Sequence, residues 1–496
     1  MADLDVVVAG GGPTGLMLAA ELALAGVDVA VVERRPTQEL EGMRAGGLHA
    51  RTLEIFDQRG IVDRFVVEGQ KSQSAGFAGV KLEITGFPTR HPYSLGLWQT
   101  HTERLLLDWV TELQVPIHRG IEVTGFVEDD TGVTVDLNNG TVLRTKYLVG
   151  CDGSRSAVRR AAGIGFVGAA ATVSNLIAEA EMTGSPPLGV HRGPLGIHSF
   201  GRTAYRIVEG EVVFEEEGPI RMMVTEAEVG ERGTPTLDDL RAALVAACGT
   251  DYGVHSPVSI TRFTDATRQA ARYRAGRVFV AGDAAHVHPP DGGQGLQLGV
   301  QDAVNLGWKL ALAVKGQATG TLLDTYEQER HPVAARVLRH TLAAVALRRD
   351  DDRTRALREM FGDLLAVPEA RRVLAGEMTQ LGLRYDFGEG HPLLGRRMPD
   401  LEVRSDDSPV RVYSMMHRAQ ALLIDLRGGL DIGGWSDRVR TVRASYDGPW
   451  DLPVLGEVKA PSAVLVRPDG YVAWVGEGTD AGLAEALTRW FGPPAV

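Results

Sequence analysis

A glycine-rich turn near the start of the chain has the spacing that holds the pyrophosphate of a dinucleotide. The G-x-G-x-x-G pattern consists of Gly10, Gly12 and Gly15, with Pro13 and Thr14 between the last two glycines. The first glycine permits a tight turn, the second lets the pyrophosphate approach the backbone, and the third lets a helix pack closely on a strand. Glu33 and Arg34 follow at the end of a β-branched run, where a carboxylate can accept hydrogen bonds from ribose hydroxyls. These residues predict a dinucleotide cofactor, with FAD and NAD as alternatives.

Two further carboxylates follow strand-like segments later in the chain. Asp152 and Gly153 come after residues 147–151, and Asp283 comes after residues 277–282. Because the carboxyl ends of parallel strands meet at one edge of a sheet, we expect these turns to lie beside the first one. A carboxylate at Asp283 could bind a ribityl hydroxyl. Asp152 and Gly153 are equally typical of an ordinary turn.

A glycine-rich irregular segment, residues 284–297, leads into an apolar helix expected at 300–314. Backbone N–H groups at the start of a helix stabilise negative charge, such as the charge that a reduced flavin carries at its N1 and C2-carbonyl end. His286 and His288 lie in this segment and could suggest a metal. No third ligand follows at a suitable spacing, so we predict no metal site.

The elements that must position these turns suggest an α/β fold with α+β elements. Strands at 6–9 and 27–33 flank a helix at 16–25, as in a Rossmann-like unit. Short alternating runs at 172–182, 196–200, 203–208 and 219–224 predict an inserted antiparallel sheet, followed by a helix at 237–247. Residues 332–370 look helical. Beyond residue 400, strand and helix signals include a turn at 467–470 that joins strands 463–466 and 471–475. We therefore predict a discontinuous first domain (1–165 and 265–390), a middle sheet domain (166–264) and a C-terminal domain (400–496).

Composition excludes several classes of partner. The chain has 496 residues and a formal net charge of −12, which argues against nucleic acid. Cys151 and Cys248 are its two cysteines, so we expect a reducing compartment rather than a disulfide framework. The acidic start of the chain is unlike a secretory signal, and the apolar stretch at 16–25 is too short to span a bilayer. The sequence predicts a cytoplasmic protein that is not bound to a membrane.

Together with residues 44–54 and Gln99, these segments resemble the class A FAD-dependent aromatic hydroxylases, whose fold is typified by p-hydroxybenzoate hydroxylase. Within that class the chain looks like the aromatic polyketide hydroxylases of the angucycline, anthracycline and tetracycline type. The resemblance covers essentially the whole chain, since residues 400–496 look like the thioredoxin-like domain of that subfamily. This domain contains no cysteine, so it cannot carry out dithiol chemistry.

The resemblance implies a role for each matching residue. The glycine turn and Glu33 would hold the ADP part of FAD, and Arg44 would lie near the phosphates on a mobile loop. Gln99 would contact the adenosine or ribityl side, Asp152 would face both FAD and NADPH, and Asp283 would hold the ribityl chain. The isoalloxazine would lie against residues 290–297, hereafter the flavin loop, through Pro290, Gly293, Gly295, Leu296 and Gln297. The family usually has Asn where this chain has Gln297. An aromatic substrate would lie between the middle sheet and the flavin, with His198, Phe200, Tyr205, Met222 and Val224 as candidate pocket residues.

The function implied is an FAD-dependent, NAD(P)H-consuming monooxygenase. It would use O2 and a flavin C4a-hydroperoxide to hydroxylate a polycyclic aromatic polyketide or related phenol, with Arg44 and the flavin loop letting the flavin move. The absence of a second G-x-G-x-x-G turn fits transient nicotinamide binding. Alternatives are Baeyer–Villiger or oxygen-independent oxidation by the same flavin and, from another class, a catalytically silent flavin-binding partner in a biosynthetic complex. The choice between NADPH and NADH stays open, and a homodimer is possible.

Overall fold

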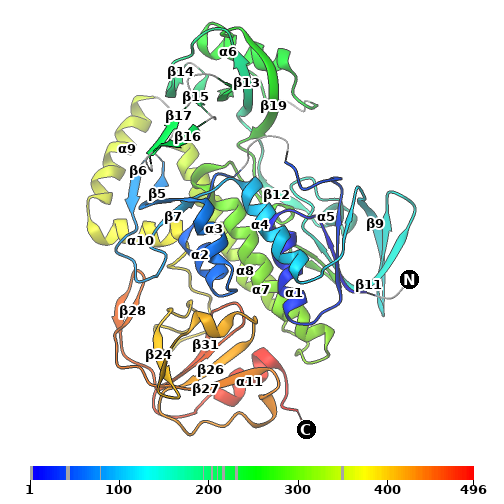
Figure 1. The fold of residues 1–496 in the computed structure, drawn as a ribbon, viewed down its shortest axis with the longest axis vertical. Helices are drawn as coiled ribbons and strands as arrows, with labels where there is room; N and C mark the ends of the chain where they lie inside the picture. The colour runs from blue at the N-terminus through cyan, green and yellow to red at the C-terminus, as the bar shows by residue number, and fades with distance from the viewer. Residues whose placement is uncertain are drawn as a thin grey trace.

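The computed structural model describes residues 4–40, 45–78, 80–193, 195–202, 205–208, 211–214, 218–229, 233–347 and 351–495. Arg44 lies outside these residues. Figure 1 shows three parts along the longest axis: an antiparallel sheet at the top, a mixed sheet with long helices at the centre, and a smaller α/β part that contains the C-terminus at the bottom. We call them the middle, central and C-terminal parts.

The central sheet has a parallel core. Its strands β22 (Val278–Val280), β11 (Val142–Gly150), β1 (Leu4–Ala9), β2 (Val29–Glu33) and β8 (Ile117–Arg119) are adjacent in that order, and every neighbouring pair among them is parallel. The short β21 (Arg274–Ala275) pairs antiparallel with β22, while β9 (Val123–Asp129) and β10 (Gly132–Leu137) extend the sheet from β11. The ends of β1, β11 and β22 therefore bring the three predicted turns to one edge, as expected for a Rossmann-like sheet.

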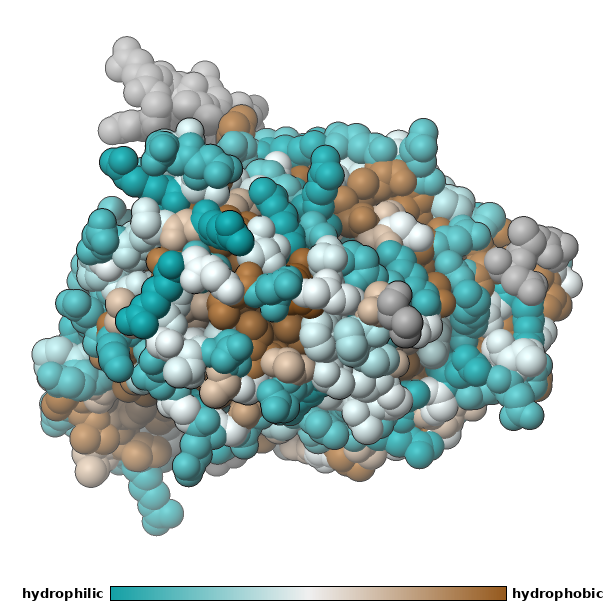
Figure 2. All heavy atoms as spheres, turned by 90° about the horizontal axis from the view of Figure 1, so that it is seen from below, coloured by the Kyte–Doolittle hydropathy of each residue, from teal (hydrophilic) through white to brown (hydrophobic). Residues whose placement is uncertain are grey.

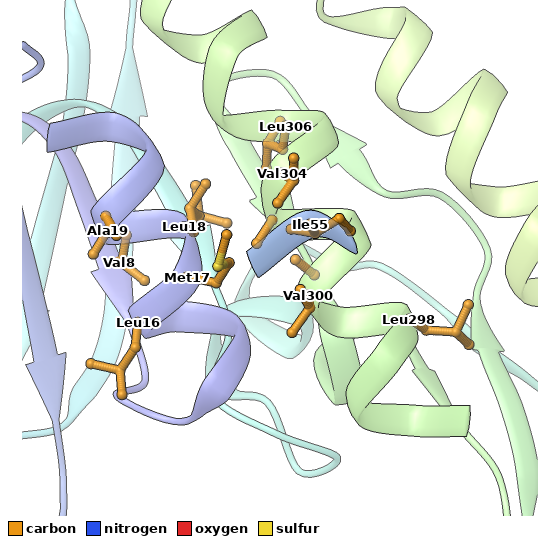
Figure 3. Packing of buried hydrophobic residues seen from close by; sticks show 14 of the residues in the cluster. Val8, Leu16, Met17, Leu18, Ala19, Ile55, Leu298, Val300, Val304 and Leu306 are labelled. Carbon is orange, nitrogen blue, oxygen red and sulfur yellow. The ribbon is translucent and has the colours of Figure 1, made fainter. Parts of the chain in front are cut away.

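Buried helices cover this sheet. They are α1 (Pro13–Leu24), α2 (Ala50–Asp57), α4 (Gln99–Glu112), α7 (Gln294–Val314) and α8 (Asp324–Ala346). Figure 3 shows Met17 and Leu18 of α1 pointing toward Ile55 of α2 and Val304 of α7. The three helices thus share one core, in which residues from the start, the first fifth and the middle of the chain pack together.

Helix α7 starts six residues earlier than the sequence suggests, at Gln294 rather than at Val300. Gly292 and Gly293, with φ values of 70° and 62°, turn the chain into the helix. Glycines inside a helix lower its intrinsic stability, which disguised this start in the sequence. In the structure they let α7 approach α1: a Cβ on Gly307 would lie 2.7 Å from Cβ of Glu21.

The middle part is an antiparallel sheet with one helix. The strand order is β14 (Gly189–Gly193), β15 (Gly196–Arg202), β18 (Ile220–Thr225), β13 (Ser174–Met182) and β19 (Val254–Thr264). Helix α6 (Leu237–Cys248), which opens with a capping box between Thr236 and Asp239, packs on the outer face of this sheet (Figure 1). The strand expected at 203–208 is β16 (Tyr205–Val208), paired with β17 (Glu211–Phe214). The side chain of Tyr205 lies outside the described part of the chain.

The C-terminal part has a four-stranded sheet in the order β27 (Val439–Arg443), β26 (Ala421–Asp425), β30 (Ala463–Val466) and β31 (Val472–Gly476), followed by α11 (Leu483–Phe491). Only β26 and β27 are parallel. The C-terminal part thus combines a mixed sheet with a closing helix, and its thioredoxin-like character stays a prediction. Trp490 of α11 packs on Trp308 of α7, with ring centroids 6.4 Å apart, so the C-terminal part shares a hydrophobic core with the central helices.

The described residues form four further α-helices and twelve short strands. The other helices are α3 (Val62–Glu68), α5 (Ala157–Ala161), α9 (Asp352–Leu365) and α10 (Pro368–Thr379), so the predicted helical stretch 332–370 spans parts of three helices. The other strands are β3 (Gly47–Leu48), β4 (Gln70–Ser72), β5 (Ser74–Phe77), β6 (Val80–Glu83), β7 (Ser94–Gly96), β12 (Phe166–Ala169), β20 (Thr267–Ala270), β23 (His286–Val287), β24 (Glu402–Ser405), β25 (Ser408–Arg411), β28 (Trp450–Leu452) and β29 (Gly456–Val458). Among the described residues, no helix has the length and apolar character needed to cross a bilayer.

Candidate flavin and substrate site

The three glycines of the first turn face different surroundings. A Cβ on Gly10, whose φ is 108°, would lie 2.3 Å from the carbonyl oxygen of Cys151, and a Cβ on Gly15 would lie 1.9 Å from the carbonyl oxygen of Gly10. These two glycines let the strands and α1 pack. A Cβ on Gly12 would meet open space instead. Gly12 precedes Pro13, the first residue of α1, so this space lies at a helix N-terminus, where backbone N–H groups favour a phosphate.

Glu33 is buried at the end of β2 and is held in place by the protein. Its carboxylate accepts hydrogen bonds from the backbone N–H of Gly11 and, at 2.9 Å, from both the backbone N–H and Nε of Arg35. Burial raises the pKa of Glu33, but the hydrogen bonds from Arg35 and Gly11 outweigh it, so the net pKa is lowered. Arg34 is exposed. The sequence pointed to Arg34, whereas the contacts are made by Arg35.

A polar cluster extends from Glu33 toward Gln99. Glu103 of α4 is 1% exposed and accepts hydrogen bonds from Arg35 Nη1 (3.0 Å), Gln38 Nε2 (2.6 Å) and Gln99 Nε2 (2.8 Å). Gln99 Oε1 accepts a 3.3 Å hydrogen bond from the backbone N–H of Ala45, the first described residue after Arg44. Gln99 therefore connects the predicted phosphate loop to the Glu33 end of the site. Sequence reasoning missed Arg35, Gln38 and Glu103, because no motif marks them.

The two carboxylate oxygens of Asp152 differ in their hydrogen bonding. Its Oδ2 accepts hydrogen bonds from the backbone N–H groups of Ala157 (2.7 Å) and Val158 (3.2 Å) at the start of α5. Its Oδ1 is buried and has no hydrogen-bond partner among the described residues. Because a buried carboxylate oxygen is costly to leave unpaired, this atom fits a ligand donor. Arg159 joins this turn to the third one through a 2.9 Å hydrogen bond to the carbonyl of Ala284.

The third turn is held by a buried carboxylate behind it. Asp302 of α7 accepts hydrogen bonds from the backbone N–H of Gly282 (3.1 Å) and from Arg330 Nε (2.7 Å), and its Oδ2 lies 2.7 Å from His286 Nε2. Burial raises the pKa of Asp302, but Arg330 and His286 outweigh it and lower the pKa overall. Asp283 itself is exposed at the edge of the sheet, available to a ligand. No group of three metal-ligating side chains occurs among the described residues.

Gln297 lies in the first turns of α7, and its side chain is turned toward α2. Its Nε2 donates to the carbonyls of Gly47 (2.8 Å) and Gly293 (3.3 Å), and its Oε1 accepts from Thr52 Oγ1 (2.5 Å) and the backbone N–H of His49 (3.2 Å). All four hydrogen-bonding positions of the amide are used within the protein. Pro290 and Gly293 of the flavin loop are exposed, while Gly295 and Leu296 are half-buried.

A cavity of about 510 Å³ opens beside the flavin loop. Glycine, alanine and serine residues form much of its wall, with a few larger side chains between them. The lining includes Gly46, Gly47, His49, Phe77, Gly292, Gly293, His340 and Met378. Burial lowers the pKa of His49 to about 4, an effect that its hydrogen bonds to the backbone of Met378 and Gly292 oppose. At neutral pH this wall therefore carries an uncharged imidazole.

The candidate pocket residues on the middle sheet face away from this cavity. His198, Phe200, Met222 and Val224 are buried, and the last three belong to the hydrophobic cluster that packs the sheet against α6. Side chains alternate along a strand, so the choice of these positions selected the covered face. We therefore propose the opposite face of the sheet as the one that faces the substrate.

The opposite face of the middle sheet meets the central part at Trp98. Arg221 lies over the Trp98 ring, 4.4 Å from its centroid, and a Cβ on Gly46 would lie 3.0 Å from the same ring. Met223 stands on the Arg221 face, opposite Ser199 on one side and Ile177 on the other, and is half-buried. Gly46 also lines the cavity, so Trp98 connects the inner face of the sheet to the cavity wall.

FAD fits the residues of this edge. The open space before α1, the unpaired Oδ1 of Asp152 and the exposed carboxylate of Asp283 lie at the carboxyl ends of β1, β11 and β22, and the cavity lies beyond them at the flavin loop. A dinucleotide that carries a flat ring at one end needs these features in this order.

Comparisons with known proteins give this arrangement a family. Residues 3–341 match the family model described as "FAD binding domain", and residues 391–494 match "Aromatic-ring hydroxylase, C-terminal". A rifampicin monooxygenase from Streptomyces venezuelae is 45% identical, with 98% of each chain covered. A dialkyldecalin synthase from Streptomyces rugosporus is 36% identical, with 99% of each chain covered. The solved structure of an anhydrotetracycline hydroxylase from Streptomyces rimosus superimposes with a TM-score of 0.88 at 42% identity, covering all of both chains.

The FAD family model covers more than half of the chain, and these relatives align along nearly its whole length. The chain therefore belongs to the FAD-dependent aromatic-ring hydroxylases, which are monooxygenases that use O2 and a reduced nicotinamide.

Proposed function

We propose that this chain hydroxylates a polycyclic aromatic polyketide or a related phenol. The observation that carries the proposal is the cavity of about 510 Å³, whose wall is shared by the flavin loop and by residues 72–78 and 94–96. Its volume lies within the range of sites that enclose drug-sized ligands. The names of the rifampicin and anhydrotetracycline relatives support a large fused-ring substrate.

Bound FAD would supply the reduced ring that activates O2 for transfer of one oxygen atom to the substrate. The protein would bind and orient both molecules. Gly12 and the start of α1 would hold the pyrophosphate, and Asp283 would hold the ribityl chain. Phe77 and Met378 would contact the apolar rings of the substrate. His49 would contribute an uncharged, half-buried polar group to the same wall.

Stimulated NADPH oxidation tests this function. Purified protein loaded with FAD is mixed with a series of polycyclic phenols and quinones, and NADPH consumption is followed together with the mass and the NMR structure of the product under ¹⁸O₂. We expect at least one fused-ring phenol to accelerate NADPH oxidation and to gain one labelled oxygen atom without ring expansion. A product with oxygen inserted into the carbon skeleton would instead support the Baeyer–Villiger alternative, and an unlabelled oxidised product would support oxygen-independent oxidation.

A second candidate function deserves the same assay, because one relative is named a dialkyldecalin synthase rather than an oxygenase. On that reading the chain would use its flavin site without transferring oxygen, as a flavin-binding partner in a biosynthetic complex. Flavin that NADPH cannot reduce in the presence of any tested aromatic would support it. Flavin that is reduced only when an aromatic is present would exclude it.

Three further proposals concern the nicotinamide donor, the cellular location and the assembly of the enzyme. The nicotinamide donor would bind transiently at the exposed edge near Asp152, as NADPH or NADH. The cytoplasm is the proposed location, since both Cys151 and Cys248 are free thiols. A homodimer is the proposed assembly, and light scattering of the purified protein tests it directly.

A further inference from the structure

The turn between β30 and β31 of the C-terminal part is buried against the central helices. Arg467 is fully buried, and its two Nη atoms contact the two carboxylate oxygens of Glu329 on α8, at 2.8 and 2.7 Å. Asp469 is 2% exposed, and its Oδ2 accepts a 3.3 Å hydrogen bond from Asn305 of α7. A Pro-Asp-Gly turn is ordinarily a solvated connection. Here the turn touches α7 and α8, the two helices that follow the flavin loop.

The same turn also holds α2 and the residues just after it. Arg51 Nη2 donates a 3.1 Å hydrogen bond to the carbonyl of Asp469, and the Arg51 guanidinium lies 5.1 Å from the ring centroid of Tyr471. Arg59 Nη2 donates a 2.8 Å hydrogen bond to the carbonyl of Pro468. A further ion pair joins Glu54 to Arg397 at 3.0 Å. Four buried charged side chains thus fix α2 to the C-terminal part.

The other side of α2 reaches the flavin site. His49 is the N-cap residue of α2 and lines the cavity, and its Nε2 lies beside the flavin loop, 3.5 Å from the position of a Cβ on Gly293. Gln297 joins Thr52 of α2 and the backbone of Gly47 to the first turns of α7. Helix α2 therefore lies between the C-terminal turn and the flavin loop and has specific polar contacts with both.

Buried ion pairs contribute little net stability, since removing charges from water offsets much of their attraction, but separating the partners leaves an unpaired buried charge and is costly. The hydrophobic contact of Trp308 with Trp490 already supplies apolar burial between the two parts. The outer end of the C-terminal part, seen from below in Figure 2, is largely hydrophilic with smaller hydrophobic patches. The charged contacts with α2 and α8 lie on the opposite side of the C-terminal part, where it meets the central part.

We propose that the C-terminal part is a positioning element of the flavin site: its turn at Arg467–Tyr471 fixes α2 relative to α7 and so holds the wall formed by His49, Gly47 and the flavin loop. Arg51 is a positioning residue that acts through α2. This proposal rests on the FAD site and is independent of the substrate. It assigns the cysteine-free domain a role that needs no redox chemistry.

The test compares two arginines of similar burial. Arg51→Met removes the contact with the turn and the 3.2 Å contact of Arg51 Nη1 with Glu54, while Glu54 stays paired with Arg397. Arg438→Met is the matched control, because Arg438 donates to the carbonyls of Phe491 (2.5 Å) and Gly434 (2.8 Å) within the C-terminal part and does not face α2. FAD affinity is measured by fluorescence titration of the apoprotein, and the visible spectrum of the bound flavin is recorded with it.

We expect Arg51→Met to raise the Kd for FAD about tenfold, the scale of a typical coupling between sites, and to shift the flavin spectrum. Arg438→Met should lower Tm with the Kd and the spectrum unchanged. Arg51→Lys keeps the charge and the fold, so it provides the same measurement with a smaller expected effect. Wild-type Kd and spectrum in a folded Arg51→Lys or Arg51→Met protein would overturn the proposal. Equal changes in Kd for Arg51→Met and Arg438→Met would overturn it too, since general destabilisation would then explain both.

Discussion

Thr14 of α1 lies against Gly299 of α7, where the dinucleotide turn meets the helix that follows the flavin loop. A Cβ on Gly299 would lie 2.2 Å from Thr14 Oγ1, and a Cβ on Gly282 would lie 2.5 Å from the same atom. One threonine hydroxyl thus fills the space that both glycines leave. At this point the glycine turn near the start of the chain and the segment from Gly282 to Gly299 have complementary shapes.

The contact between Thr14 and Gly299 predicts a pair of variants. Gly299→Ala should destabilise the protein by about 1–3 kcal/mol, because it overpacks a helix contact that has no room for a methyl group. Thr14→Ala combined with Gly299→Ala should recover most of that loss, since the atom nearest the new methyl is removed. Urea unfolding of the two apoproteins measures both effects. A double variant as unstable as Gly299→Ala alone would show that the strain lies elsewhere.

Gly12 should behave differently from Gly15, although both belong to one motif. A methyl on Gly12 meets open space, so Gly12→Ala should fold with wild-type stability but should weaken FAD binding on the order of 10- to 100-fold, because it occupies the approach of the pyrophosphate. Gly15→Ala would place its Cβ 1.9 Å from the carbonyl oxygen of Gly10 and should impair folding itself. Thermal unfolding of the apoproteins and FAD titration separate the two. Unchanged FAD affinity in Gly12→Ala would place the pyrophosphate elsewhere.

The lowered pKa of His49 predicts an acid-sensitive flavin-loop wall. His49 has a pKa of about 4 in the folded protein and an ordinary pKa of 6.5 when unfolded. Between these values the unfolded state binds the extra proton, so stability should fall as the pH decreases from 6.5 to 4 and should be independent of this group above 6.5. The loss is at most about 3 kcal/mol. Urea unfolding of the wild type and of His49→Gln across this range checks it: the variant should show a shallower dependence, and an equal slope would refute the assignment.

Much of the cofactor edge could be predicted from the sequence, because parallel strands place their carboxyl ends together. Strand, glycine turn and carboxylate were enough to locate Gly10, Asp152 and Asp283 at one edge. Local detail was not predictable. Arg35 rather than Arg34 bonds Glu33, since the turn after β2 decides which of two adjacent arginines points back. No pattern in the sequence marks Glu103, because its partners Arg35 and Gln38 come from a distant loop.

Two further features could not be predicted from the sequence, for a related reason. They are which face of the middle sheet is covered and that the C-terminal turn is buried. Alternation along a strand separates two faces but does not say which face a helix will cover, so Phe200 and Met222 were assigned to the pocket and not to the α6 core. The turn around Asp469 has the composition of a surface loop. Only the packing of β30 and β31 on α7 and α8 buries it. In both cases the deciding contact is made by a residue far away in the chain.

Adjacent methionines of β18 separate the two faces by experiment. Met222 is 1% exposed under α6, so Met222→Ala should cost about 2–5 kcal/mol in the free energy of unfolding and should leave KM for the aromatic substrate unchanged. Met223 is half-buried on the inner face beside Arg221, so Met223→Ala should change stability by about 0.5 kcal/mol or less. The Met223→Ala variant should raise KM several-fold and increase the H2O2 formed per NADPH, because a loosely held substrate ring leaves activated oxygen unused.

Steady-state kinetics and peroxide assays with a fused-ring phenol that stimulates NADPH oxidation measure KM and H2O2 formation. If Met222→Ala changed KM while Met223→Ala changed only stability, the substrate would have to lie on the α6 side of the sheet.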